Sequence, residues 1–176
     1  MLGRWAFVIL LLVGVVGAVW FGLPEAHKKI TEGDVVENFK LPDLQGKLHS
    51  MPKGEVVLLN FWATWCPPCR QEMPSMIALS KKYESQGLKV IAVSVDRDAT
   101  ALKNFVDEYK IPFLVLNDAD SSVSSGYGVF RYPETFLIDR EGRVQAHMLG
   151  AVDWMLPQIQ DGIENLLKGK ALAQAK

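Results

Sequence analysis

Two cysteines, Cys66 and Cys69, are the only ones in this 176-residue chain, and only two residues separate them. Paired thiols at this spacing can form a reversible disulfide, exchange it with another protein, or supply two ligands to a metal such as zinc. A zinc site needs further ligands, and the chain has only His27, His49 and His147, which are scattered in sequence. The pattern therefore favours redox chemistry, with a purely structural disulfide or a zinc site as the alternatives.

The segments on either side of the cysteines can position them. The apolar run 56–62 predicts a buried strand, and apolar residues at helical spacing after the cysteines predict a helix. Cys66 would lie at the start of this helix, where unpaired backbone N–H groups and the helix dipole favour an anion. We therefore interpret Cys66 as the nucleophile, the more exposed of the two thiols. Cys69, one helical turn later, would resolve the mixed disulfide.

The two residues between the cysteines, Pro67 and Pro68, bear on the redox potential. Pro67 suits a first helical turn, but neither proline has a backbone N–H that could stabilise a Cys66 thiolate. A less stabilised thiolate leaves the disulfide form relatively favoured. The sequence thus predicts a reductant, with a potential nearer that of thioredoxin, about −270 mV, than that of DsbA, about −120 mV.

The remaining sequence predicts an α/β fold in which a central mixed sheet has helices on both faces. Further strands are predicted at 35–41, 47–51, 88–95, 112–116, 135–138 and 144–149. A helix is predicted after Asp98, a single turn within 118–126, and a last helix opening at Asp153 with Met155 on its apolar face. The net charge of −1 gives no indication of nucleic-acid binding.

The N-terminal segment 5–23 has no charged residue and is long enough to cross a bilayer, with Trp5 and Trp20 near its ends. We interpret residues 1–23 as an uncleaved membrane anchor. A cleaved signal sequence is the alternative, although Pro24 two residues before Ala26 makes a poor cleavage site. The predicted organisation continues with a linker at 24–33, one domain at 34–168 and a tail at 169–176. Because thiol–disulfide exchange is useful in exported compartments, the domain is expected on the periplasmic side of the cytoplasmic membrane.

Three runs of sequence, FWATWCPPCRQEMP, VIAVSVD and YPETFLIDREGRV, resemble the thioredoxin superfamily. More narrowly, they are similar to its membrane-anchored TlpA/ResA/CcmG (DsbE) branch, over roughly residues 33–168. The resemblance implies a thioredoxin-like fold with an added N-terminal β-hairpin at 35–51 and an inserted helix–strand unit at 96–117. Asn60 stands where thioredoxin itself has a buried aspartate, and Glu72 matches an acidic residue of the anchored branch.

The resemblance also implies roles for residues around the cysteines. Glu72 would accept a proton from Cys69, with which its i+3 spacing lets it share a helix face. The alternative is a solvated acid near a helix start. Pro133 would be a cis-proline facing the cysteines, and Tyr132 would offer its backbone to an extended peptide. An ordinary trans proline is the alternative there.

Aromatic and proline side chains beside the cysteines complete the predicted substrate surface. Trp65 would shield the nucleophile and contact substrate, and Pro67 and Pro68 are predicted to contact substrate as well. Trp62, at the end of the strand, is interpreted as a core residue.

The sequence therefore predicts a thiol–disulfide oxidoreductase that reduces disulfides of exported proteins and needs no cofactor beyond its own disulfide. The resemblance implies apocytochrome c as the client and a membrane dithiol carrier as the electron donor. A monomer is expected. The alternatives are a reductant for other clients, such as a copper-site assembly protein, and a metallochaperone using the same cysteines. A peroxidase is disfavoured because no Thr-x-x-Cys motif is present.

Overall fold

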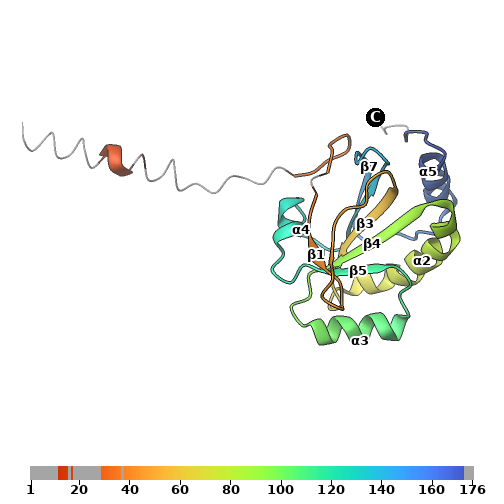
Figure 1. Ribbon diagram of the computed structural model, residues 1–176, viewed down its shortest axis with the longest axis horizontal. Helices are drawn as coiled ribbons and strands as arrows, with labels where there is room; N and C mark the ends of the chain where they lie inside the picture. Colours follow the sequence, from red (N-terminus) through yellow and green to blue (C-terminus); the bar gives the residue numbers. More distant parts are fainter. Residues whose placement is uncertain (1–11, 16, 18–28, 37, 173–176) are drawn as a thin grey trace, which may run out of the picture.

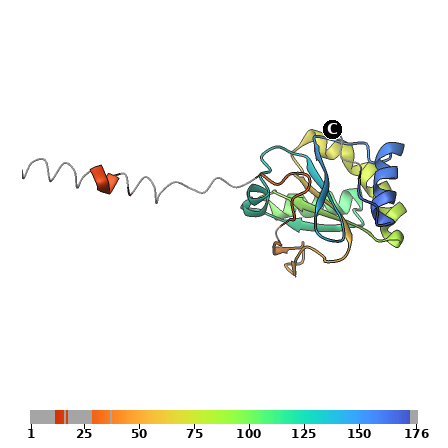
Figure 2. The ribbon, with the colours of Figure 1, turned by 90° about the horizontal axis from the view of Figure 1, so that it is seen from above.

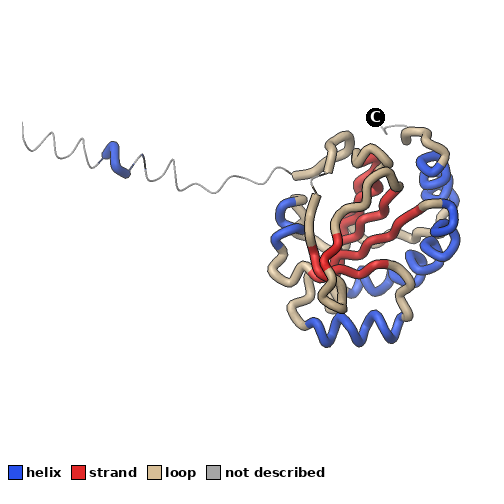
Figure 3. The backbone as a smooth tube through the Cα atoms, in the orientation of Figure 1, coloured by secondary structure: helices blue, strands red, loops and turns tan. Residues whose placement is uncertain are grey.

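A five-stranded mixed sheet forms the centre of the protein (Figure 1). The structure is a computed structural model, and it describes residues 12–15, 17, 29–36 and 38–172. The strands of the sheet are β3 (Val56–Trp62), β4 (Leu88–Ser94), β5 (Leu114–Asn117), β6 (Glu134–Ile138) and β7 (Val144–Leu149). The order across the sheet is β5-β4-β3-β6-β7, with β3, β4 and β5 parallel and β6 and β7 antiparallel to their neighbours. The predicted central mixed sheet is confirmed (Figure 3).

Helices cover both faces of this sheet, as predicted. They are α2 (Pro67–Tyr83) with the short 3₁₀ turn η1 (Glu84–Gln86), α3 (Ala99–Tyr109), α4 (Ser122–Gly126) and α5 (Pro157–Leu167). Figures 1 and 2 both show α5 beside α2 at one side of the sheet and α4 at the opposite side. The carboxylate of Asp98 caps α3 by accepting the N–H groups of Thr100 and Ala101, which matches the predicted helix start.

Successive side chains of the central strand β3 point to opposite faces of the sheet, so the strand contributes to the core on both faces. Val57, Leu59 and Phe61 pack with Tyr127 and the N-terminal segment on the face covered by α4. Val56, Leu58 and Trp62 point to the other face, where the side chains of α2, α3 and α5 cover them. All seven residues of β3 are buried, because helices or loops cover both faces. Trp62 is fully buried, as predicted.

The N-terminal hairpin is present but much shorter than predicted. It consists of β1 (Leu41–Pro42) and β2 (Leu48–His49), which pair antiparallel. The Asp43 carboxylate holds the turn by accepting the backbone N–H groups of Gln45 and Lys47. The predicted strand at 35–41 is wrong for most of its length. Its first residue, Val35, instead bridges to Arg143, just before the edge strand β7.

The last helix begins later than predicted. Pro157 occupies its first turn, and Leu156 before it is extended, because a residue preceding proline is disfavoured in the helical conformation. Met155 therefore lies outside the helix and is exposed, so its predicted place on the apolar face is wrong. Trp154 occupies that interior position instead and is fully buried.

The predicted location in a membrane needs correction. Among the residues that the structure describes, no helix combines the length and the apolar character needed to cross a bilayer. Most of the predicted anchor at 1–23 falls outside the described residues, which include only 12–15 and 17 of that segment.

Candidate active site

The two cysteines form a disulfide at the point where β3 leads into α2. Cys66 is the N-cap residue of α2, and Cys69 lies in its first turn, with the two Cα atoms 5.3 Å apart. The N–H of Cys69 donates to the sulfur of Cys66 at 3.3 Å, because the two prolines between them have no N–H to offer. Cys66 is 5% exposed and Cys69 is completely buried. An incoming thiol or disulfide can therefore approach Cys66 more readily than Cys69.

The wall opposite the disulfide is the segment that precedes β6. The Tyr132–Pro133 peptide bond is cis, in agreement with the prediction. The carbonyl oxygen of Tyr132 lies 3.5 Å from the sulfur of Cys66. Trp65 meets the ring of Tyr132 edge-on, with ring centroids 6.0 Å apart, and is 64% exposed. Segments about 66 residues apart in the sequence thus form one rim around Cys66.

A buried polar cluster lies on the α2 side of the sheet, behind the disulfide. The side-chain amide of Asn60 donates to Glu72 Oε1 and to Thr135 Oγ1, both at 2.9 Å. The backbone N–H of Val152 donates to the other carboxylate oxygen of Glu72 at 3.1 Å. Glu72 is only 3% exposed. The alternative interpretation of Glu72 as a solvated acid is therefore wrong.

Burial raises the pKa of Glu72 to about 7 from its ordinary value of 4.5, although the bonds from Val152 and Asn60 act in the opposite direction. A carboxyl group with this pKa exchanges a proton near neutral pH, which is the range in which a general acid or base is most useful. Its position three residues after Cys69 on α2 places it one turn further along the helix. The cluster thus contains a buried carboxyl group that can be either protonated or ionised near neutral pH.

A second buried carboxylate holds the loop that leads into Cys66. Asp96, 3% exposed and just beyond β4, accepts the N–H of Thr64 at 2.9 Å and its hydroxyl at 2.7 Å. The hydroxyl of Ser94 donates to the same carboxylate at 2.6 Å. From outside, the guanidinium of Arg70 donates to the carbonyl oxygen of Thr64 and lies 5.1 Å from the centre of the Phe105 ring. The position of Cys66 is therefore fixed from both sides of the loop.

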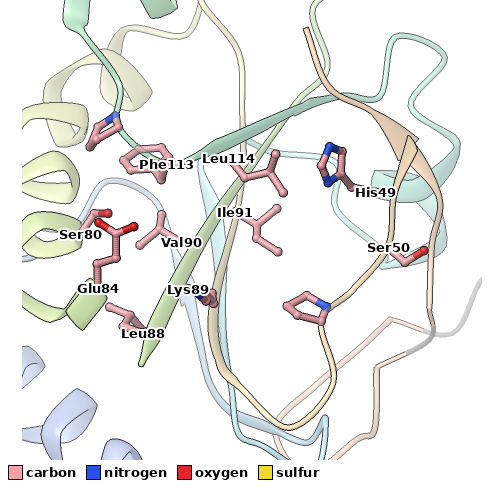
Figure 4. Close-up of a pocket in the computed structure, with 12 residues that line it drawn as sticks. His49, Ser50, Ser80, Glu84, Leu88, Lys89, Val90, Ile91, Phe113 and Leu114 are labelled. Atoms are coloured by element: carbon pink, nitrogen blue, oxygen red, sulfur yellow. The ribbon is translucent and has the colours of Figure 1, made fainter. Parts of the chain in front are cut away.

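Two hollows on the surface differ in their relation to the disulfide. A cleft of about 690 Å³ lies beside the cis-proline and includes Tyr132 and Pro133 in its lining. A smaller one of about 320 Å³ lies over the first halves of β4 and β5, between α2 and β2, with Val90 and Phe113 in its lining (Figure 4). Because β3 and β4 are parallel and Cys66 follows the end of β3, the smaller hollow lies at the other end of the sheet. Only the larger cleft adjoins the redox site.

No group of three or more histidine, cysteine, aspartate or glutamate residues within the described part of the chain could hold a metal ion. The cysteine pair is joined in a disulfide, which leaves neither sulfur free as a thiolate ligand.

The structure brings most of the predicted site residues together around Cys66. Trp65 and Tyr132 are in direct contact, and Pro133 follows Tyr132. Pro67 and Pro68 open α2 directly after Cys66, with Pro67 exposed. Glu72 is set back on the buried side of the disulfide.

Three partners of these groups were missed by sequence reasoning, namely Asp96, Thr135 and Val152. Asp96 ends the run VIAVSVD and Thr135 lies within YPETF. Both residues therefore belong to the runs that carried the family resemblance, but neither was assigned a role. Val152 contributes only a backbone N–H, which leaves no signal in the residue type.

A cysteine pair at the N-terminus of a helix, facing a cis-proline at the end of a mixed sheet, places the protein among the thioredoxin-like thiol–disulfide oxidoreductases as a class. Comparisons with known proteins agree. The model of the AhpC/TSA family matches residues 33–147. Thiol-disulfide oxidoreductase ResA of Bacillus thuringiensis subsp. konkukian (strain 97-27) is 37% identical over 171 residues, which cover 94% of this chain and 95% of the relative.

Two further proteins extend the comparison. Thioredoxin-like protein YneN of Bacillus subtilis (strain 168) is 38% identical over 161 residues, covering 86% of this chain and 93% of YneN. A crystal structure of a Chlorobium tepidum protein assigned as thiol:disulfide interchange protein DsbE superimposes with a TM-score of 0.73 at 33% identity, covering 79% of this chain and 99% of that one. This chain therefore belongs to the AhpC/TSA family of thioredoxin-like proteins, and it is a ResA-like thiol–disulfide oxidoreductase.

Proposed function

We propose that this oxidoreductase works as a reductant of disulfides in other proteins. The direction is supported by Pro67 and Pro68, which have no N–H to stabilise a Cys66 thiolate, and the order of attack by the contrast between the two cysteines. Cys66 lies at a rim that an extended peptide can reach, whereas Cys69 is fully buried on the side of Glu72. The cis-proline segment offers its backbone beside Cys66, in the manner of β-strand addition.

The reaction begins from the reduced Cys66–Cys69 pair. The Cys66 thiolate attacks one sulfur of the client disulfide, so one S–S bond forms to Cys66, the client bond breaks, and the second client sulfur leaves as a thiolate. Cys69 passes its proton to Glu72 and attacks the sulfur of Cys66, so the internal S–S bond forms, the mixed disulfide breaks, and the first client sulfur leaves as a thiolate. The client is released as a dithiol after taking up two protons, one returned from Glu72 and one from solvent, which had received the proton of the Cys66 thiol. Two electrons have moved to the client.

A client and an electron donor complete the proposed cycle. A donor dithiol must reduce the Cys66–Cys69 disulfide again before the next client, and the membrane dithiol carrier predicted from the sequence is our candidate. Apocytochrome c is our candidate client, because its Cys-x-x-Cys-His segment must be reduced before haem attachment. We propose that the protein acts as a monomer, since one chain contains both cysteines, Glu72 and the cis-proline wall.

The direction of electron flow can be tested by equilibrating the purified full-length protein with mixtures of reduced and oxidised glutathione. The fraction in the disulfide form is then measured by thiol alkylation. We expect a potential near that of thioredoxin, about −270 mV. A potential near that of DsbA, about −120 mV, would contradict a role as reductant.

The identity of the client requires a trapping experiment. A Cys69→Ser variant cannot resolve its mixed disulfide, so clients stay attached to Cys66 and can be identified by mass spectrometry. Recovery of apocytochrome c would support our candidate, and recovery of a copper-site assembly protein would favour the other client class. Stoichiometric copper or zinc in the reduced full-length protein would instead favour the metallochaperone alternative.

A further inference from the structure

The cleft beside the cis-proline has a lining that can distinguish one client from another. Its volume is about 690 Å³, and it shares Tyr132 and Pro133 with the wall that faces Cys66. The N–H of Gly150 donates to the carbonyl oxygen of Pro133 at 2.9 Å, so the loop after β7 is tied to the floor of the cleft. The cleft therefore directly adjoins the wall that faces Cys66.

Two large apolar side chains on the cleft are exposed to solvent. Phe130, on the segment before the cis-proline, is 72% exposed, and Leu149, the last residue of β7, is 64% exposed. Single exposed apolar residues are normal on protein surfaces. Here, however, both line one cleft that adjoins a reactive disulfide, which is the usual character of a peptide-binding surface.

Two cations also line the cleft, Lys29 and Arg131, and both are exposed. Neither forms an ion pair within the described part of the chain. Elsewhere the exposed lysines Lys103 and Lys168 each pair with an acidic residue one helical turn away. The two positive charges on the cleft are therefore free to attract an acidic group from a partner.

One carboxylate, that of Glu134, lies in the same lining, and its negative charge opposes the two positive charges. Glu134 is only 3% exposed, and the Nε2 atom of His147 lies 3.4 Å from its Oε2 atom. The ring of His147 is itself stacked on Phe136 in the interior. Since Glu134 is buried and the two cations are at the surface, the charge that an approaching peptide meets first is positive.

We propose that this cleft binds the residues that flank the reactive cysteine of the client, and that it selects a client with an apolar and an acidic side chain next to that cysteine. The apolar side chain packs against Phe130 and Leu149. The carboxylate binds Arg131, whose planar guanidinium can donate two parallel hydrogen bonds, with Lys29 adding a second positive charge. This inference rests on the proposed function, because it concerns the same disulfide clients.

The test uses full-length protein reduced in advance and freed of reductant. Three peptides carry one cysteine, each joined in a disulfide to a small neutral thiol, and differ in one position beside the cysteine: Leu-Glu, Leu-Gln or Leu-Lys. The measurement is the second-order rate constant for oxidation of the protein by each peptide. We expect the Glu peptide to react about tenfold faster than the Lys peptide at low salt, with the difference shrinking as salt is added.

Charge variants test the assignment to Arg131 and Lys29. Arg131→Gln should reduce the preference for the Glu peptide, and Arg131→Glu should reverse it. Lys29→Glu, a second and independent substitution, should also weaken the preference for the Glu peptide. Lys81→Glu, which makes the same change at an exposed position of α2, is the matched control and should leave the preference intact. A preference that changes equally in the Lys81 control would overturn the proposal.

The apolar half of the proposal has its own test. Replacing the leucine of the Glu peptide by glycine should slow the reaction in the wild-type protein, and should slow it less in a Phe130→Ser variant, which keeps only Leu149 of the two apolar side chains. Leu48→Ser, at a leucine of β2 that is 63% exposed, is the matched control and should retain the effect of the leucine. Equal rates for the leucine and glycine peptides in the wild-type protein would overturn the apolar contact.

The outcomes separate this inference from the proposed function. If the wild-type protein reacts with all peptides at the same rate, the reductase function stands and the selectivity of the cleft is refuted. If the reduced protein reacts with none of them, the proposed function itself fails, and the inference fails with it.

Discussion

The two sides of the Cys66–Cys69 disulfide differ in the burial and the bonding of their side chains. On the Cys69 side, polar groups are buried and bound to one another, as in the chain from Thr135 through Asn60 to Glu72. On the Cys66 side, large side chains are exposed, as with Trp65 and Arg131, and Arg131 forms no ion pair within the described residues. The difference matches the two roles proposed above, because proton transfer is favoured by a fixed, dry setting, whereas client recognition needs a surface whose binding groups remain free.

The cysteines themselves give the largest expected effect. Either Cys66→Ser or Cys69→Ser should abolish disulfide reduction, because each removes one of the two sulfurs that carry electrons. Only Cys69→Ser should accumulate a mixed disulfide, since the buried Cys69 is a poor point of attack. Non-reducing gel electrophoresis after mixing with an oxidised peptide distinguishes them. Accumulation of adduct in Cys66→Ser instead would reverse the assigned roles.

Glu72→Gln should give the next largest effect. The pKa of Glu72 is about 7 in the folded protein and near 4.5 in the unfolded chain, so the folded state binds more protons between these values. The free energy of unfolding of the wild-type protein should therefore fall as pH rises through this window, by about 3 kcal/mol. The neutral amide of the Glu72→Gln variant removes this dependence. The free energy of unfolding of the variant, relative to that of the wild-type protein, should therefore be more favourable above pH 7 than below pH 4.5.

Denaturant unfolding at several pH values measures this difference, and the pH–rate profile of disulfide reduction should lose its inflection near pH 7 in the same variant. Glu84→Gln changes an exposed carboxylate directly after α2 and is the control. A Glu72→Gln protein with an unchanged pH–rate profile would argue that the buried cluster is structural only.

Asp96→Asn tests the support of the Cys66 loop. The amide can no longer accept hydrogen bonds at both former carboxylate oxygens, so the bonds from Thr64 and Ser94 cannot all be kept. We expect a loss of about 2 kcal/mol in the free energy of unfolding and slower attack by Cys66. The control is Asp107→Asn, an exposed acid on α3. A loss no greater than in this control would show that Thr64 does not depend on the carboxylate.

Trp65→Ala should have the smallest effect on stability, within about 0.5 kcal/mol, because the side chain is 64% exposed. Its effect should appear in client binding, as an increase in KM for a disulfide peptide with little change in kcat. Trp65→Phe keeps an aromatic edge towards Tyr132 and should restore part of the binding. A large loss of stability in the alanine variant would show that Trp65 contributes to packing, which would contradict its assignment to the exposed surface beside Cys66.

The sequence by itself determined the chemistry and much of the scaffold. The Cys66-x-x-Cys69 spacing and the apolar run of β3 predict a redox pair between a strand and a helix, and the structure agrees. These features are local, since periodicity and helix starts depend on neighbouring residues along the chain. The cis-proline at 133 was implied instead by the family resemblance, and the structure agrees there too. The predicted strand at 35–41 was wrong because its pairing partner, near β7, is distant in sequence.

Only the tertiary structure decided the surroundings of the redox pair. The residue types do not reveal that Val152 donates its N–H to Glu72, that Asp96 holds Thr64, or that Lys29 and Arg131 line one cleft. These spatial neighbours lie from about 30 to 100 positions apart in the sequence, and no local periodicity encodes their proximity. The pKa of Glu72 has the same origin, because desolvation by the folded chain, rather than the carboxyl group itself, raises it.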